Sequence, residues 1–445
     1  MKKVWLLGFG FFSISITWSL YNAFVPFFLE KYVESVALIS FMMTIDNYFA
    51  LFLQPWVGNR SDRTVTRFGR RMPYLLAGMP LAAVLTMLLP FHSGLFTLLL
   101  FMMMMNLAMS LYRSPTVALM PDITPDARRT KANGLINFMG GVGSILAFGA
   151  GSFLYETSPV LPFLVAGLIT LLCLFIVSRS IKESRDGINA GLATTYAPGA
   201  PGKENGTANG TANGIANGTA NGTANGPADG ALTEAVTGIN GKPPRISLLR
   251  QLDRTTIWLL TAIFFWFVAY QGVETLFTLY GKNHLGLSEQ AASFSLTFFS
   301  LAFVIFAIPS GWLGGRFGKK KVITIGVIGL TAVFILVSLT ESLLALRGLL
   351  LVGGMFWACI NINSYPYIVA TGTEESIGTR TGMYYLVSSL AAISSPPLLG
   401  LLIDLTDYAI LFYAAAGSMA LALLSLFLMK GPSKDAGTPA YSRES

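Results

Sequence analysis

The feature that most constrains this chain is a series of apolar runs that recurs along most of its 445 residues. A helix of 18 or more apolar residues is long enough to cross a bilayer core of roughly 30 Å. Only 12% of the residues are charged, against about 25% in soluble domains. The runs lie at residues 4–29, 36–58, 73–91, 95–121, 132–155, 161–179, 255–280, 289–313, 322–340, 343–370, 381–403 and 408–430. The pattern predicts an all-α membrane protein with twelve transmembrane helices.

A long polar region follows the sixth run and predicts a division into two six-helix halves. We assign residues 1–180 to the first half and residues 255–430 to the second. The region between them, residues 181–254, contains Asn-Gly-Thr-Ala repeats and has no apolar period. This composition is typical of a flexible, disordered linker. We expect the linker and the tail at residues 431–445 to be cytoplasmic.

Basic residues are distributed very unevenly between the two sides of the predicted membrane. With the N-terminus inside, 26 lysines and arginines lie on the inner side and 3 on the outer side. Cytoplasmic loops of membrane proteins carry such an excess. We therefore expect a multi-pass protein of the plasma (inner) membrane with both termini in the cytoplasm. The net charge of +8 reflects this topology, so we expect the lipid bilayer as a partner and no nucleic acid. We expect a monomer.

Several other functional classes lack support in the sequence. The two histidines, His92 and His284, lie in separate short loops, so no histidine metal cluster is expected. The glycines of the fifth run lie inside a span, where they favour close helix packing over a nucleotide loop. We found no Walker lysine motif and no nucleophile–base arrangement. We predict that the protein is not an enzyme and uses no cofactor and no metal.

The two halves repeat short motifs at corresponding places. Arg67-Phe68-Gly69 follows the second run, and Arg316-Phe317-Gly318 follows the eighth. Pro115 precedes Arg129 by 14 residues, and Pro366 precedes Arg380 by the same interval. Such echoes indicate an internal duplication, which in transporters places the binding site near the bilayer midplane between the repeats.

The basic hinge between the second and third runs carries a family resemblance. From Gln54 to Pro73 it reads Gln-Pro-Trp-Val-Gly-Asn-Arg-Ser-Asp-Arg-Thr-Val-Thr-Arg-Phe-Gly-Arg-Arg-Met-Pro. It resembles the major facilitator superfamily, and within it the sucrose-transporter family and its bacterial relatives among the glycoside/cation symporters. The expected cytoplasmic gate motif, with its echoes, comprises Gly58, Asp62, Arg63, Gly69, Arg70, Arg71, Arg129, Gly318 and Arg380. Asp62 is the only acid in the hinge, and we expect it to pair with nearby arginines or with the inner end of another span.

This resemblance implies a secondary active transporter that works by alternating access. It implies proton-coupled symport of a glycoside or disaccharide similar to sucrose or maltose, so the expected partners are a small-molecule solute and a coupling ion. Val117 stands where plant sucrose carriers have an arginine, which leaves the sugar itself open. The alternatives are an efflux carrier for drugs or other organic solutes and, from another class, a non-transporting membrane sensor.

Few charged residues lie deep in the predicted spans, where charge is costly and usually functional. They are Asp46, Arg113 and Glu274, and Asp122 follows at the inner end of the fourth span. Arg113 and Asp122 lie about 180° apart around one helix, so Arg113 requires a carboxylate from another span, and Asp46 and Glu274 are the candidates. We assign these four residues to a coupling relay. The alternative for Arg113 is a fixed buried ion pair, and the alternative for Glu274 and Asp46 is a hydrogen bond between packed helices.

A sugar site requires hydrogen-bonding groups and a flat ring for the apolar face of the sugar. Polar and aromatic residues share helix faces in several spans. The candidates for substrate binding are Trp18, Tyr21, Asn22, Asn47, Asn106, Tyr270, Gln271, Trp357, Asn361 and Tyr384. Helix packing is the alternative role for each of them.

Overall fold

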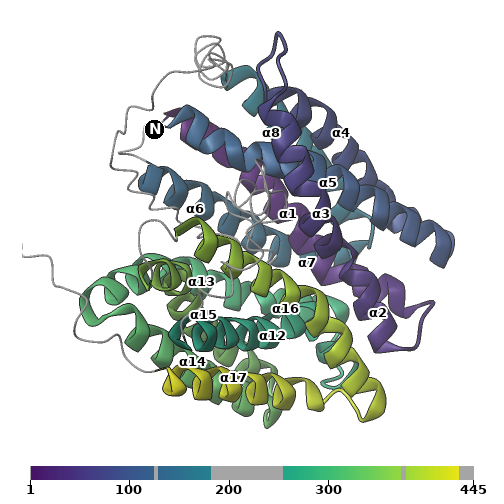
Figure 1. Ribbon diagram of the computed structural model, residues 1–445. Helices are drawn as coiled ribbons and strands as arrows, with labels where there is room; N and C mark the ends of the chain where they lie inside the picture. Colours follow the sequence, from purple (N-terminus) through teal and green to yellow (C-terminus); the bar gives the residue numbers. More distant parts are fainter. Residues whose placement is uncertain (1, 125–128, 182–253, 372–376, 430–445) are drawn as a thin grey trace, which may run out of the picture.

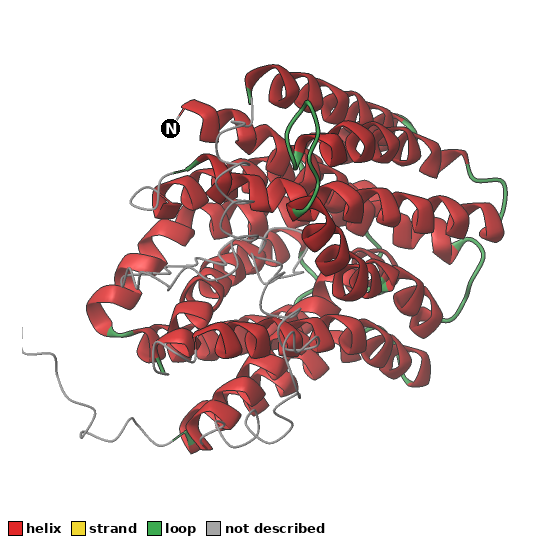
Figure 2. Ribbon diagram, turned by 45° about the horizontal axis from the view of Figure 1, so that its top comes forward, coloured by secondary structure: helices red, strands yellow, loops and turns green. Residues whose placement is uncertain are grey.

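The computed structural model describes residues 2–124, 129–181, 254–371 and 377–429. Within these ranges every regular element is a helix, and short loops join the helix ends (Figure 2). Twelve stretches are long and apolar enough to cross a membrane, which confirms the predicted fold class. Apart from residues 181 and 254, the proposed linker lies outside the described residues, and so does the proposed tail.

Among its described residues, the first half contains eight α-helices and one short 3₁₀ helix. They are α1 (Lys2–Glu30), α2 (Val36–Met43), α3 (Ile45–Asp62), α4 (Met72–Leu88), η1 (Leu89–Phe91), α5 (Leu95–Ile123), α6 (Arg129–Phe148), α7 (Ala150–Thr157) and α8 (Leu161–Ser180). The second half contains α12 (Arg254–Asn283), α13 (Glu289–Phe317), α14 (Lys319–Ser338), α15 (Leu343–Ala370), α16 (Ile377–Leu405) and α17 (Ile410–Leu428).

Two spans that the sequence predicts as single helices are interrupted. The second span breaks at Thr44 between α2 and α3, and the fifth breaks at Gly149 between α6 and α7. The Thr44 hydroxyl donates to the carbonyl of Phe41 at 2.8 Å, and such local bonds compete with regular helix bonds. The first break places Asp46 in the first turn of α3. A helix N-terminus carries partial positive charge, which favours a carboxylate there.

The halves share one packing scheme. In the first half α1 packs on α6 and α8, while α4 packs on α5 and α8. In the second half α12 packs on α16 and α17, while α14 packs on α15 and α17. These pairs correspond one to one in chain order, as the internal duplication predicts. The purple-to-blue helices of the first half lie beside the teal-to-yellow helices of the second half (Figure 1).

The contacts between the halves follow the same correspondence. Helix α2 packs on α16, α13 packs on α6 and α7, and α1 packs on α12. The second span of each half therefore meets the fifth span of the other. Any site between the halves is enclosed by helices from both repeats.

The duplication extends to backbone conformation in the hinges. Gly69 has φ of 112° and Gly318 has φ of 92°. Residues with a Cβ rarely adopt this region, whereas glycine enters it freely. The backbone conformation of the turn therefore explains why the repeated Arg-Phe-Gly motif ends in glycine in both halves.

Candidate functional site

The basic hinge is fixed to the first half through Arg71, whose side chain is only 7% exposed. Its guanidinium forms an ion pair with Asp62, contacts Asp122 Oδ2 at 3.2 Å, and donates to Ser61 Oγ at 2.5 Å. Arg70 also binds Asp122, at 2.5 Å. These bonds join the ends of α3 and α5 to the start of α4. The expectation that Asp62 pairs with a nearby arginine is confirmed.

The remaining residues of the predicted gate motif occupy different environments. The carbonyl of Gly58 accepts a bond from Arg71 at 3.4 Å, while Arg63 is exposed. Arg129 begins α6, but its side chain lies outside the described residues. Asp122 lies at the end of α5, where it binds Arg70 and Arg71 of the hinge. It points away from the face of α5 that carries Arg113. The bonds of Arg70 and Arg71 to Asp62, Ser61 and Asp122 lie within the first half.

The corresponding end of the second half is held by Arg380, which is buried. Its Nη1 donates to Thr256 Oγ1 at 2.8 Å and to Thr371 Oγ1 at 2.5 Å. Lys319 Nζ donates to the carbonyl of Pro366 at 3.3 Å. These bonds tie the starts of α12, α14 and α16 to the end of α15. Each repeat is thus braced by basic residues on the same side.

Four polar side chains of the first half lie near one another in what we name the Asp46 cluster, formed by Tyr21, Asp46, Asn106 and Arg113. The Asn106 amide donates to the Tyr21 hydroxyl at 3.4 Å. Asp46 lies close enough to Tyr21 and Arg113 to interact with both electrostatically. All four are buried. The structure therefore brings together, from α1, α3 and α5, residues that the sequence places far apart.

Two further candidates of the first half border this cluster. The Trp18 ring meets the Tyr21 ring edge-on, with centroids 5.5 Å apart. Trp18 Nε1 and Asn47 Oδ1 have no hydrogen-bond partner within the described ranges, although both atoms are buried. Buried polar atoms are usually satisfied, so we treat these two atoms as candidate contacts for a ligand.

The aromatic candidates of the second half stack against one another. The Tyr270 and Trp357 rings are parallel to within 2°, with centroids 4.0 Å apart. The Tyr384 hydroxyl lies 3.0 Å from Ser364 Oγ. Gln271 is buried on α12, and Asn361 is half-buried on α15. Trp357 Nε1 also lacks a hydrogen-bond partner in the described part of the chain, so this wall carries both a flat ring and an available donor.

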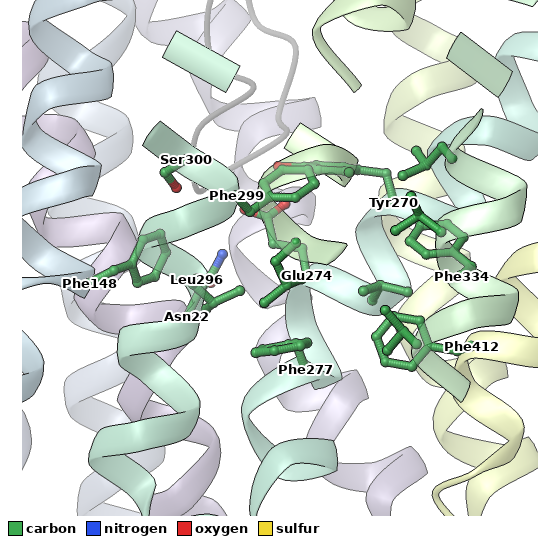
Figure 3. Close-up of a pocket in the computed structure, with 16 residues that line it drawn as sticks. Asn22, Phe148, Tyr270, Glu274, Phe277, Leu296, Phe299, Ser300, Phe334 and Phe412 are labelled. Carbon is green, nitrogen blue, oxygen red and sulfur yellow. The ribbon is translucent and has the colours of Figure 1, made fainter. Parts of the chain in front are cut away.

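A cavity between the halves has Glu274 in its wall. Figure 3 shows its lining residues, which come mainly from α12, α13, α14, α15 and α17, with Asn22 and Phe148 from the first half. The empty space between these residues is about 680 Å³, a volume that includes open solvent. Asn22, Tyr270 and Glu274 were predicted from sequence, whereas the surrounding phenylalanines were not.

An ionic network joins the halves where α1 ends, on what we name the Glu30 face. Lys282 Nζ lies 2.8 Å from Glu30 Oε2 and 2.9 Å from Glu289 Oε1. The Tyr155 hydroxyl donates to Glu289 Oε2 at 2.7 Å, and the Asn283 amide donates to Glu30 at 2.5 Å. Residues from α1 and α7 thereby bind residues from α12 and α13. The halves are closed against each other on this face.

A second contact on the Glu30 face involves Asp404, near the end of α16. Its carboxylate accepts bonds from the backbone N–H groups of Val36 and Ala37, at 2.7 and 3.0 Å, and from Ser35 Oγ at 2.6 Å. The first N–H groups of a helix have no partner within the helix, and an acid satisfies them. The second half therefore caps the N-terminus of α2 in the first half.

Sequence reasoning missed the residues of the Glu30 face. Glu30, Lys282 and Glu289 lie at span ends, where charged residues are ordinary. The one available signal was that Lys282 is among the three basic residues on that side. The pairing depends on how the halves dock, and nothing local encodes it.

Twelve spans, two equivalent halves and buried polar groups between them define a multi-pass integral membrane protein with the architecture of a transporter. A family model described as Major Facilitator Superfamily matches residues 7–295 and 281–444. The chain belongs to the Major Facilitator Superfamily. It is a membrane transporter and not an enzyme, as the sequence predicts.

Curated relatives are distant and varied. The chain is 23% identical to the class B tetracycline resistance protein of Escherichia coli, over 74% of this chain and 71% of that protein. It is 25% identical to the sucrose transport protein SUC4 of Arabidopsis thaliana, over 32% of this chain and 31% of that protein. The dipeptide and tripeptide permease A of Chromobacterium violaceum is 28% identical, over 42% of this chain and 39% of that protein. The chain thus matches about a third of the length of the sucrose transporter.

A solved structure shares the fold. It is the crystal structure of a bacterial homologue of the human lysosomal transporter Spinster, in an inward-facing and occupied conformation. The match has a TM-score of 0.63 at 13% identity and covers 96% of this chain and 94% of that one. At this identity the likeness shows the arrangement of helices alone.

Proposed function

We propose that this chain is a proton-coupled symporter that imports a glycoside or disaccharide by alternating access. The observation that carries the proposal is the Asp46 cluster, in which an acid in the first turn of a broken helix lies within electrostatic range of Arg113. Discontinuous helices that place helix ends and ionisable groups at midmembrane are typical of ion-coupled transporters. The sucrose transporters among the relatives support the sugar as cargo.

The groups around the cluster suit a sugar. Tyr21 and Asn106 supply hydroxyl and amide groups, and the second half supplies the stacked rings of Tyr270 and Trp357. Trp18 Nε1 and Trp357 Nε1 are buried donors that sugar hydroxyls can satisfy. Because an unpaired buried donor costs about 1–3 kcal/mol, a hydroxyl that binds it contributes both affinity and specificity.

Coupling rests on the buried carboxylates. Protonation of Asp46 removes its attraction for Arg113, which then becomes available to the solute, and deprotonation reverses this. Glu274 is the second proposed carrier, on the opposite side of the interface. Because a carboxylate changes charge on proton binding and its glutamine or asparagine analogue does not, the neutral variants retain binding and lose the ion-linked step.

The basic residues orient the transporter. We propose that the hinge side faces the cytoplasm of a plasma-membrane protein and that the Glu30 face is external. In this arrangement the structure is closed to the outside. We also propose that residues 181–254 and 431–445 lie in the cytoplasm and that the protein is a monomer.

The decisive experiment uses proteoliposomes and a panel of labelled sugars, with and without an imposed proton gradient. We expect Asp46→Asn or Glu274→Gln to abolish uphill accumulation and to spare sugar counterflow, which requires no net proton movement. Asp407→Asn, in an exposed loop, is the matched control. Normal gradient-driven accumulation in both variants would contradict the coupling role.

Export of an organic solute is a second candidate, favoured by the tetracycline resistance relative, which matches three quarters of the chain. The same proteoliposome assay distinguishes export of an organic solute from import of a sugar. A solute that leaves the cytoplasmic-side compartment against its gradient, with no uptake of any sugar, would establish export. No observation favours a non-transporting sensor.

A further inference from the structure

The cavity beside Glu274 is polar at one end and apolar at the other. Four of its lining residues carry polar side chains, and they are Asn22, Tyr270, Glu274 and Ser300. The other twelve are apolar or glycine. Figure 3 shows Phe277 and Phe412 together on one side of the cavity, away from Ser300. A fully hydroxylated sugar would lose hydrogen bonds at the apolar end, at a cost that such a lining cannot repay.

The apolar end is built from rings of the second half. Phe412 contacts Phe334 with centroids 5.7 Å apart and contacts Phe277 at 6.4 Å. Leu330, Val333 and other aliphatic side chains complete the wall. Rings and aliphatic groups recognise apolar ligand surface, while a few polar groups fix its orientation.

Gly353 keeps this space open. A Cβ built at Gly353 would lie 3.3 Å from Val333 Cγ1, 3.6 Å from Leu330 Cδ1 and 3.7 Å from Phe299 Cδ2. Gly353 therefore leaves a gap on α15 at a point where α13, α14 and α15 converge. A side chain at this position would occupy part of the cavity without changing any charge.

We propose that the transported solute is amphipathic and that its apolar substituent binds in this phenylalanine-lined cavity of the second half. The proposal rests on the proposed function for its polar part, a sugar held by groups at the interface between the halves. The polar residues Asn22, Glu274 and Ser300 lie at the end of the cavity where the two parts of such a solute join. The cargo is then a glycoside with an apolar aglycone, and a free disaccharide binds more weakly.

The test is a homologous series with one sugar and a growing substituent, from methyl to butyl, hexyl and phenyl glucoside. Affinity for the purified full-length protein is measured by calorimetry, with hexyl glucoside kept below its critical micelle concentration. We expect affinity to rise about fourfold for each methylene until the cavity is full, because each buried methylene gains transfer free energy.

A substitution in the cavity wall provides a second test of the same proposal. We expect Gly353→Ala to weaken hexyl glucoside at least about fivefold by crowding and to leave methyl glucoside within about twofold. Gly348→Ala is the matched control, because it lies on the same helix and its Cβ would meet open space. It should change neither affinity.

The outcomes separate the two proposals. If methyl glucoside and disaccharides fail to bind and the longer glucosides fail too, the proposed sugar function is wrong. If methyl glucoside binds but affinity stays flat along the wild-type series, the inferred cavity role is overturned. The inferred cavity role is also overturned if affinity rises equally along the series in wild type and in Gly353→Ala. The melting midpoint of the variant shows that it is folded.

Discussion

At the scale of single residues, burial decides which charges matter. Arg70 and Arg71 are neighbours that share Asp122 as a partner, but their side chains are 32% and 7% exposed. Arg71 also holds Asp62 and Ser61. Removing one partner from a buried pair leaves an uncompensated charge, whereas an exposed pair contributes little.

We therefore expect Arg71→Gln to lower the free energy of unfolding by about 3 kcal/mol and Arg70→Gln by no more than about 1 kcal/mol. The measurement is denaturant or thermal unfolding of the purified protein in detergent. Arg70→Gln serves as the matched control, since it removes the same charge from the same partner. Equal losses of unfolding free energy in the two variants would show that burial does not determine how much each arginine contributes to stability.

At the scale of elements, glycines allow α6 to lie against α1. A Cβ at Gly143 would lie 2.7 Å from the carbonyl oxygen of Phe12, and one at Gly140 would lie 2.9 Å from Ser15 Oγ. Small residues at such contacts let helix backbones approach closely in a membrane. The interpretation of the fifth-span glycines as packing residues is confirmed at these two positions.

We expect Gly143→Val to push the two helices apart and to lower the free energy of unfolding by about 1–3 kcal/mol, the usual cost of overpacking. Gly134→Val on the same helix is the control, because a Cβ there meets nothing within 4 Å. Both changes carry the same intrinsic helix penalty, so the difference between their melting midpoints isolates the contact. A difference near zero would contradict the packing role.

At the scale of the whole molecule, the Glu30 face holds the halves together. Lys282 binds carboxylates on both sides of the interface, and Asp404 caps a helix of the opposite half. Helix α2 connects that cap to the break at Thr44, next to Asp46. Opening this face therefore removes the cap of α2 and disturbs the helix that leads to the proposed coupling residue.

We expect the double variant Lys282→Met with Asp404→Asn to favour the state that is open at the Glu30 face. Two partly exposed contacts of about 1 kcal/mol each change the population ratio by roughly 30-fold. Spin labels at Thr157→Cys and Glu341→Cys, one in each half, report the separation. A longer distance component should grow in the double variant.

The control for this prediction is Asp407→Asn, which changes a neighbouring acid in the exposed loop after α16. It should leave the distance distribution as in the labelled parent. An unchanged distribution in the double variant would show that the ionic network does not hold this face closed.

The sequence alone determined those features of the protein that depend on local composition and on the spacing of residues. Apolar length sets the number of spans, because a bilayer admits few other solutions. Repeated motifs revealed the two halves, and the hinge identified the family. Charges in the spans, such as Asp46 and Arg113, were found because burial in lipid makes them costly and rare.

Only the tertiary structure decided which of these residues meet. Asp46 and Arg113 are 67 positions apart in the chain, and their proximity depends on how α3 packs against α5. The breaks at Thr44 and Gly149 escaped prediction, because the apolar runs at residues 36–58 and 132–155 continue past both positions. The Glu30–Lys282–Glu289 network arises where the two halves dock, and the phenylalanine cavity arises where helices of the second half pack together beside that interface. Docking depends on surface shape over whole helices, and no local pattern in the sequence encodes it.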